Sequence, residues 1–298
     1  MDYSKAEQVG NDIVLTGVKH FDPAQTLDNG QAFRWAEIKR KTEADENLHS
    51  ASVFFSGIAY GRQLDLCFSN DTLTLKNTDL TEFETTWKTY FDFTRSYSKI
   101  HEIFSSDETN EGNKVLKQAI NAYPGLRMLR QDIWETLISF ILSQNSNIPR
   151  IKKMIQALCE NFGEKLPAGG YCFPTPQAIA ALKPGDLHKI KSGYRAAYII
   201  DAATRFADGR FNPVLLEEMP SDVVYQSLLS IHGVGPKVAD CVLLFGFGRV
   251  ERFPLDVWIK RVMAKLYPSG FPRGLEKYSG IAQQFLFHYA RLHKEQFV

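Results

Sequence analysis

Cysteines are few in this 298-residue sequence, and their spacing matches no common metal-binding pattern. The chain has four of them, widely scattered, with no CxxC pair and no His-linked spacing: Cys67, Cys159, Cys172 and Cys241. A zinc site or an iron–sulfur cluster is therefore not expected, nor is any catalytic cofactor. Reduced thiols in a cytosolic compartment are the default for such a chain.

Long apolar runs are missing as well. No stretch of 18 apolar residues occurs, and the first residues, MDYSKAEQVGND, lack a signal-peptide pattern. The sequence therefore predicts a protein with no membrane partner that is not exported. Internal repeats and low-complexity segments are also absent, which argues against solenoid folds.

Net charge is small overall, at +1, but the charges are unevenly divided. Residues 1–116 carry 12 Lys and Arg against 19 Asp and Glu, a net charge of −7. Residues 117–298 carry 23 against 15, a net charge of +8. A basic C-terminal portion is typical of a surface that binds duplex DNA, although solubility alone also accounts for such a charge.

The N-terminal part has the patterning of an antiparallel sheet. Residues 12–17 form a strand candidate, and apolar residues alternate with polar ones over residues 64–69 and 72–75. Residues 69–71 suit a hairpin turn, and residues 39–50 suggest a polar loop. A helical pattern over residues 83–104 is interrupted near 90–93, and SSDETNEGN (105–113) reads as a linker.

Helical patterns dominate after the linker. The most apolar helix is expected over 133–142, followed by a polar break at 143–147 and a short turn at 187–190. Further helices are expected at 150–162, 175–182, 195–208, 221–230, 237–246, 256–266 and 275–292. We therefore predict an α+β fold, with an antiparallel sheet domain (1–116) packed on a helical domain (117–298).

Residues 231–261, IHGVGPKVADCVLLFGFGRVERFPLDVWIKR, contain the strongest motif. Two glycines and Pro236 between apolar helical runs predict a helix–hairpin–helix turn. The amides of Gly233, Val234 and Gly235 are then candidates for binding a phosphate.

Lys237 and Asp256, nineteen residues apart in this motif, each allow two interpretations. Lys237 either reaches back to a phosphate or acts as an amine nucleophile. Asp256 either caps the following helix or directs its carboxylate towards Lys237. The pair together favours the catalytic interpretation of both.

GVGPKVADC followed at this spacing by PLDV resembles the helix-hairpin-helix DNA glycosylase superfamily. Other segments resemble the 8-oxoguanine DNA glycosylase family, in that family's order from about residue 10 to residue 290. They are NGQAFRW (29–35), LRMLRQDIWETLISFILSQNSNIPRI (126–151), SGYRAAYI (192–199) and GIAQQFLF (280–287).

This resemblance implies base-excision repair of double-stranded DNA that contains oxidised guanine. Lys237 corresponds to the family's nucleophile, which forms a Schiff base at the sugar, and Asp256 to its essential carboxylate. A bifunctional glycosylase and abasic-site lyase is implied, because superfamily members without the Lys are monofunctional. A structural monovalent cation at the hairpin carbonyls also belongs to the superfamily pattern. We expect a monomer.

The resemblance further implies a pocket for the damaged base. Gly30 would present its carbonyl, Cys241 and Phe287 would sandwich the base, and Gln283 would read its Watson–Crick edge. Taken singly, each of these has a structural explanation: a turn glycine, two apolar core residues and an exposed helix residue. Their joint occurrence in the family's order favours the pocket.

A DNA-opening group is implied by Asn145, Tyr194, Arg150 and Arg195, with the two arginines suggesting preference for cytosine opposite the lesion. Ser146 and Pro149 depart from the Asn and Ala of eukaryotic members. Trp258 replaces a His that contacts the DNA backbone. These departures suggest a prokaryotic branch, hence a cytoplasmic, nucleoid-associated protein, whereas a eukaryotic one would be nuclear.

The residues disfavour three rival interpretations. An alkylated-purine glycosylase would lack the Lys at position 237. An endonuclease III-type enzyme usually has a four-Cys cluster near its C-terminus, and residues 242–298 contain no Cys. A non-catalytic helix-hairpin-helix module would need neither Lys237 nor Asp256.

Overall fold

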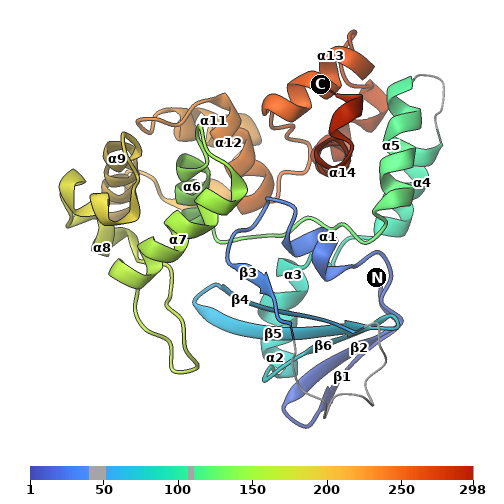
Figure 1. Ribbon diagram of the computed structural model, residues 1–298, viewed down its shortest axis with the longest axis horizontal. Coiled ribbons are helices and arrows are strands. Elements are labelled where there is room, and N and C mark those ends of the chain that lie inside the picture. Colours follow the sequence, from blue (N-terminus) through green and yellow to red (C-terminus); the bar gives the residue numbers. More distant parts are fainter. Residues whose placement is uncertain (40–51, 107–110, 298) are drawn as a thin grey trace.

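The computed structural model describes residues 1–39, 52–106 and 111–297. Figure 1 shows a twisted sheet from the N-terminal part of the chain, with a group of helices packed along one side of it. The predicted α+β class is confirmed, because one six-stranded antiparallel sheet precedes a remainder that is mostly helical. Most of the predicted polar loop, residues 40–50, lies outside the described residues.

The sheet has the strand order β1-β2-β6-β5-β4-β3. Its strands are β1 (Lys5–Val9), β2 (Asp12–Thr16), β3 (Trp35–Glu37), β4 (Val53–Ala59), β5 (Arg62–Ser69) and β6 (Thr72–Leu75). The alternating leucines of β5 and β6 are buried on one face, where Leu66 pairs with Leu75. This confirms the three strands that period-two patterning predicts, while β1, β3 and β4 were not predicted.

The predicted hairpin turn is also confirmed. Asn70 and Asp71 connect β5 to β6, and both have positive φ, 47° and 58°. Two left-handed residues in a two-residue loop match the right-handed twist of the strands, and Asn and Asp tolerate that conformation.

Fourteen α-helices lie within the described residues. They are α1 (Pro23–Leu27), α2 (Leu80–Glu82), α3 (Lys88–Tyr90), α4 (Tyr97–Ser105), α5 (Glu111–Ala122), α6 (Ile133–Leu142), α7 (Ile148–Phe162), α8 (Pro176–Ala180), α9 (Arg195–Ala207), α10 (Pro213–Glu217), α11 (Ser221–Leu229), α12 (Pro236–Cys241), α13 (Val257–Leu266) and α14 (Ser279–Leu292).

Several predicted helical boundaries need correction. The pattern over 83–104 is divided into a π-helix (Phe83–Trp87), α3 and α4, and the predicted linker ends earlier because α5 begins at Glu111. α12 passes into a π-helix at Val242, and a 3₁₀ helix precedes α14. Apolar periodicity alone does not distinguish an α-helix from these tighter or wider turns.

Two groups of buried side chains form the interior. One lies under the sheet and includes Leu15, Leu66 and Trp87, while the larger one fills the helical part around α6. The larger group includes Tyr97 and Phe104 of α4, although these precede the predicted domain boundary at residue 116. That boundary stays a prediction.

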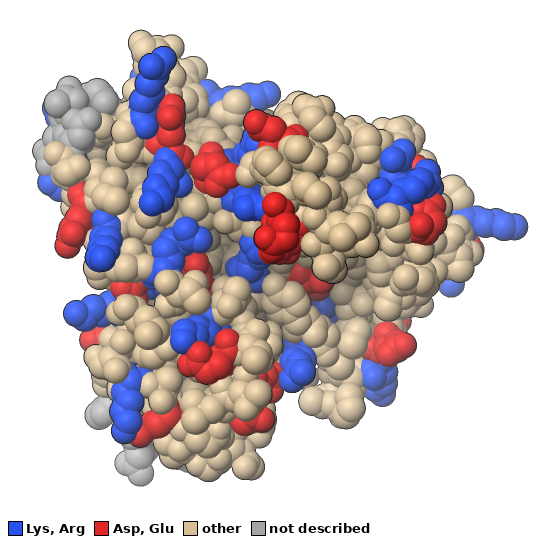
Figure 2. Space-filling view, turned by 180° about the vertical axis from the view of Figure 1, so that it is seen from behind, with Lys and Arg blue, Asp and Glu red and all other residues tan. Residues whose placement is uncertain are grey.

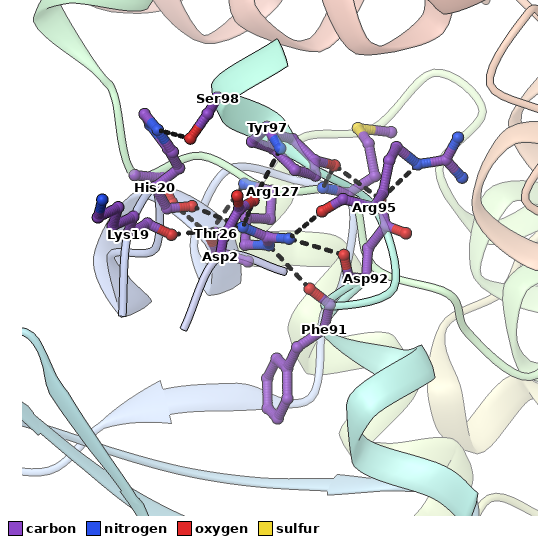
Figure 3. Close-up of polar contacts among 12 residues, drawn as sticks. Asp2, Lys19, His20, Thr26, Phe91, Asp92, Arg95, Tyr97, Ser98 and Arg127 are labelled. Carbon is purple, nitrogen blue, oxygen red and sulfur yellow. Dashed lines mark hydrogen bonds and ion pairs between the residues drawn. The ribbon is translucent and has the colours of Figure 1, made fainter. Parts of the chain in front are cut away.

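Arg127 joins the two parts of the molecule. Its side chain is fully buried, its Nη1 contacts the Asp2 carboxylate at 2.9 Å, and its Nη2 donates to the Asp92 carbonyl at 2.7 Å. The guanidinium also donates to four further backbone carbonyls, those of Lys19, His20, Phe91 and Arg95 (Figure 3). Every donor of a buried cation is therefore used to hold together the N-terminus, the segment after β2 and the segment between α3 and α4.

Asp2 completes this network from the other side. Burial alone would raise the pKa of Asp2, but the Tyr97 amide and the Arg127 guanidinium outweigh burial and hold the pKa below its ordinary value. The carboxylate is thus charged when the protein is folded, and it neutralises Arg127.

Replacing Arg127 with Met should destabilise the protein by about 3–5 kcal/mol, because Asp2 and several carbonyls would be left buried without a partner. The matched control is Arg62→Met, since the Arg62 side chain is 57% exposed in its ion pair with Glu82. That change should cost less than ~1 kcal/mol. Urea unfolding of both variants measures the difference, and equal small losses would show that Arg127 does not hold the two parts together.

Candidate active site

The candidate site begins at the end of α6. Asp132 caps this helix by accepting from the Glu135 amide at 2.8 Å, and the apolar residues that follow bury it in the helical core. The helix ends at Leu142, and Asn147 caps α7. The predicted polar break at 143–147 is thereby confirmed, and Asn145 within it has a left-handed φ of 47°.

The hairpin turn between α11 and α12 is confirmed as well. Gly233 has a φ of 81°, and a Cβ there would lie 2.2 Å from the Tyr198 ring, so only glycine fits. The Gln144 side chain donates to the Gly233 carbonyl at 3.0 Å and thus ties the turn to the polar break.

One detail of the predicted phosphate site needs correction. The Val234 amide donates to the Ile231 carbonyl at 3.0 Å and is not free for a phosphate. The amides of Gly233 and Gly235 have no acceptor among the described residues, so they stay candidates. The Ile231 and Gly233 carbonyls already accept hydrogen bonds, and a cation at this turn remains a prediction.

Lys237 lies in the first turn of α12 and reaches towards the end of α6. Its Nζ is 3.2 Å from the Ser143 hydroxyl and 4.8 Å from the centre of the Phe140 ring. These contacts hold the amine at the wall of a cavity, with no carboxylate paired to it by an ion pair in the part of the chain that the structure describes.

Asp256 both caps α13 and lines the same cavity. Its carboxylate accepts from the Ile259 amide at 2.8 Å, which confirms the capping interpretation. Burial raises the pKa of Asp256, and the Ile259 amide and the positive charge of Lys237 offset part of that rise. The two sequence-based interpretations of Asp256 are therefore compatible. One carboxylate oxygen caps the helix, and the positive charge of Lys237 still acts on the same carboxylate.

The cavity, of about 700 Å³, gathers most of the predicted site residues. These are Gly30, Asn145, Lys237, Cys241, Asp256, Trp258, Gln283 and Phe287. They come from the N-terminal domain, the polar break, α12, α13 and α14. Arg150, Tyr194, Arg195 and the hairpin residues 233–235 do not line it.

The four residues of the predicted base pocket all line this cavity. Gly30 has a φ of 94°, and a Cβ there would lie 2.9 Å from Ile148 and 3.6 Å from the Phe287 ring. Burial raises the pKa of Cys241 to about 11, so its thiol is neutral and acts as an apolar surface. Gln283 donates to the Pro254 carbonyl at 3.1 Å, while its buried Oε1 has no partner among the described residues.

Asn145, which lines the cavity, lies beside Tyr194, which does not. The Asn145 amide is 3.2 Å from the Tyr194 hydroxyl, and the Tyr194 side chain is half exposed. Arg150 is exposed on the first turn of α7. These three side chains are therefore free to contact a ligand that lies across the mouth of the cavity.

Arg195 differs from its sequence-based expectation. It is only 3% exposed, and its guanidinium donates to the carbonyls of Gln144, Asn145 and Ser192. In this conformation the Arg195 side chain is turned away from solvent and stabilises the polar break at 143–147 through these hydrogen bonds. The physical reason is that the carbonyls of Gln144 and Asn145 lie beyond the end of α6, outside any helix, and the buried arginine supplies them with donors.

Several cavity residues were missed from the sequence. Ser143 contacts the Lys237 amine, and Arg291 donates to the Asn29 carbonyl at 3.2 Å beside Gly30. Arg291 follows Phe287 by four residues, a spacing that places both on one helix face and that would have identified it. Ser143 had no such signal.

Charge on the surface is mixed where Figure 2 shows it. On this face, seen from behind relative to Figure 1, Lys and Arg side chains alternate with Asp and Glu. The net charge of the helical part is therefore not concentrated on this face. Within the described residues, no helix is long and apolar enough to cross a membrane, and no group of three His, Cys, Asp or Glu is arranged to hold a metal ion.

Comparison with known proteins places two family models along the chain. Residues 13–137 match the 8-oxoguanine DNA glycosylase N-terminal domain, and residues 138–276 match the HhH-GPD superfamily of base excision DNA repair proteins. Together the two models account for most of the described chain. Their junction differs from the predicted domain boundary at residue 116.

Solved structures match over nearly the whole length. The structure of MBOgg1 with a low-affinity DNA ligand is 38% identical, has a TM-score of 0.86, and aligns with 99% of this chain and 100% of its own. The Clostridium acetobutylicum 8-oxoguanine glycosylase/lyase, bound to duplex DNA with cytosine opposite 8-oxoG, is 31% identical. Its TM-score is 0.85, with 99% of this chain and 100% of that chain covered.

Curated relatives match over a shorter range. An N-glycosylase/DNA lyase of Saccharomyces cerevisiae is 37% identical over 158 residues, which is 48% of this chain and 42% of the relative. A probable N-glycosylase/DNA lyase of Methanothermobacter thermautotrophicus is 31% identical over 53% of this chain and 57% of its own length. The chain thus spans about half the length of the curated relatives it matches.

The double role of Asp256 predicts opposite effects of two substitutions on stability. Asp256→Ala removes the helix cap and should cost about 0.5–2 kcal/mol. Asp256→Asn keeps an acceptor for the Ile259 amide and removes a buried charge, so it should unfold at the same temperature as wild type or higher.

The raised pKa of Asp256 also predicts how the stability difference between wild type and the Asn variant changes with pH. Because the folded-state pKa of Asp256 is raised, ionisation of this group costs the folded protein stability as pH rises above the ordinary Asp pKa. The advantage of the Asn variant should therefore be larger at neutral pH than near about pH 4. Thermal unfolding at both pH values checks this, and an Asn variant as unstable as the Ala variant would contradict it.

Proposed function

Because the chain belongs to the 8-oxoguanine DNA glycosylase family of base excision repair proteins, we propose that it removes 8-oxoguanine from duplex DNA and then cleaves the abasic site. The observation that carries this proposal is a cavity lined by an amine, a carboxylate and apolar side chains together. Lys237, Asp256, Gly30, Cys241 and Phe287 all line this cavity.

The chemistry needs the damaged nucleotide to be turned out of the duplex into this cavity. The unprotonated amine of Lys237 attacks C1′ of the sugar, and the C1′–N9 bond breaks. The base leaves with the electron pair of that bond and takes up a proton. Opening of the sugar ring then gives a Schiff base between Lys237 and C1′. Loss of a proton from C2′ expels the 3′ phosphate by β-elimination.

Asp256 stabilises the positive charge that develops on the sugar as the base departs. A carboxylate that is already fixed by the Ile259 amide needs no reorganisation at that moment. Ser143 and Phe140 keep the Lys237 amine at the cavity wall. This lowers the entropic cost of bringing the amine to C1′.

The base is selected by its edges and its faces. Cys241 and Phe287 supply apolar surfaces for the two faces of a flat purine, and Gln283 faces its Watson–Crick edge. The carbonyl of Gly30 accepts a hydrogen bond from N7–H of 8-oxoguanine, whereas guanine has a lone pair at N7. The left-handed conformation of Gly30 and its close neighbours keep that carbonyl in one position.

The DNA itself is held outside the cavity. Asn145 and Tyr194 occupy the gap that the flipped base leaves, and Arg150 contacts the opposite base. The amides of Gly233 and Gly235, which have no acceptor among the described residues, contact the DNA backbone together with Trp258. The site of action is then genomic DNA, in the nucleoid of a prokaryote or the nucleus of a eukaryote. A monomer suffices, since one chain supplies every residue of the site.

The rival enzymes of the superfamily fit this cavity less well. A monofunctional alkylpurine glycosylase has no use for an amine beside Asp256, and a non-catalytic binding module has no use for either group. Lys237 is the residue whose chemistry separates these proposals.

Lys237→Gln should bind an 8-oxoguanine duplex yet neither excise the base nor form a covalent complex, because the amide cannot attack C1′. The matched control is Lys260→Gln, which removes another amine at the same cavity. Trapping with borohydride on a lesion-containing duplex should succeed for wild type and the control alone. Wild-type trapping by Lys237→Gln would exclude Lys237 as the nucleophile.

The two arginines should behave differently towards the opposite base. Arg150 is exposed, so Arg150→Met should reduce preference for cytosine opposite the lesion by roughly 5- to 150-fold, the effect of about 1–3 kcal/mol of base discrimination. Arg195 is buried, so Arg195→Met should lower the melting temperature and weaken excision opposite all four bases alike. Single-turnover rates on four duplexes measure this, and a selective loss opposite cytosine in Arg195→Met would show that Arg195 reads the opposite strand.

A further inference from the structure

Gln284 lines the candidate cavity beside Gln283, and no role has been given to it above. The side chain is 2% exposed, and its amide nitrogen has no acceptor among the described residues. Buried polar groups without partners are rare and costly, so each one calls for an explanation. At this cavity a ligand that supplies the missing acceptor is such an explanation.

The neighbouring Gln283 has the complementary deficit. Its buried Oε1 lacks a donor, while its amide nitrogen is used on the Pro254 carbonyl. The two adjacent side chains of α14 therefore offer one unused acceptor and one unused donor at the same cavity. A ligand edge with a donor next to an acceptor would satisfy both.

Position on α14 indicates which part of the ligand each glutamine meets. Gln284, Phe287 and Arg291 are spaced i, i+3 and i+7, so they follow one stripe of the helix. Arg291, at the far end of that stripe, donates to the Asn29 carbonyl at 3.2 Å and thus lies against the turn that carries Gly30. Gln284 is accordingly on the side of α14 that faces this turn, with Gln283 on the adjacent row.

The edge of 8-oxoguanine has a fixed order of groups: N7–H, then O6, then N1–H. Under the function proposed above, on which this step rests, Gly30 meets N7–H and Gln283 meets N1–H. O6 lies between them and is an acceptor. We propose that Gln284 donates a hydrogen bond to O6 of the extruded base and is a specificity-determining residue that selects 6-oxopurines.

The proposal makes a distinct prediction about substrates. 8-Oxoadenine has an amino donor at C6 and an acceptor at N1, so it reverses both groups that the glutamines meet. 8-Oxohypoxanthine keeps O6 and N1–H and lacks the 2-amino group alone. The cavity should therefore accept 8-oxoguanine and 8-oxohypoxanthine and reject 8-oxoadenine, although all three share N7–H.

Two variants test this with the full-length chain. Gln284→Leu removes the amide at nearly constant volume, and Gln284→Glu replaces the donor with an acceptor. Both should lower single-turnover excision of 8-oxoguanine and 8-oxohypoxanthine by roughly 5- to 150-fold. Excision of 8-oxoadenine should be unchanged or faster, so the ratio of the two rates falls. Cleavage of a pre-formed abasic site, which has no O6, should stay at the wild-type rate.

A structural role for Gln284 would give a different pattern. Replacing an amide that has no hydrogen-bond partner among the described residues should leave the melting temperature of Gln284→Leu unchanged or raise it. Gln156→Leu, on the exposed face of α7, is the matched control and should change neither rate. An equal loss on all three bases and on the abasic site, or an unchanged ratio, would overturn the proposal. A wild-type protein inactive on 8-oxoguanine would instead refute the proposed function.

Discussion

The buried charge of Arg127 is the constraint on which the rest of the structure depends. A guanidinium with no exposure is tolerated because Asp2 and five backbone carbonyls surround it, and those groups come from three separate segments. The segment that carries Arg127 and Leu129 also fixes the turn beside the cavity. Gln31 donates to the Arg127 carbonyl at 2.8 Å and accepts from the Leu129 amide at 2.9 Å. Gly30, one residue before Gln31, is thereby fixed against the helical part.

The polar break after α6 has the corresponding role on the other side of the cavity. Ser143 holds Lys237, Gln144 holds the hairpin at Gly233, and Asn145 contacts Tyr194. The buried Arg195 fixes this loop by donating hydrogen bonds to the carbonyls of Gln144 and Asn145. A loop of five residues therefore couples the amine to the elements that are proposed to contact DNA. Its precision comes from α6, one of the most deeply buried helices described.

Sequence patterning predicted the features that depend on local chemistry. The alternating leucines of β5 and β6, the Asn70–Asp71 turn and the glycine-rich hairpin all follow from residue-level rules. The joint location of Lys237, Asp256 and Gln283 came from resemblance to a family, because nothing local brings α12, α13 and α14 together. The burial of Arg195 and the bonded Val234 amide were unpredictable from sequence, since both depend on which carbonyls the tertiary fold leaves unpaired. Edge strands such as β1 and β3 were missed because their faces are only partly buried.

The hydrogen bond from Arg291 to Asn29 joins residues 262 positions apart. Residues from the N-terminal and the C-terminal parts of the chain therefore line the same cavity. The groups proposed for bond cleavage, Lys237 and Asp256, belong entirely to the helical part, whereas Gly30 belongs to the N-terminal part. One proposed recognition group, Gly30, is therefore encoded apart from the groups proposed for cleavage, whereas Gln283 and Gln284 are encoded in the same part as those groups. Substitutions in the Asn29–Gln31 turn can therefore change the proposed contact of Gly30 with the damaged base while the amine and the carboxylate stay unaltered.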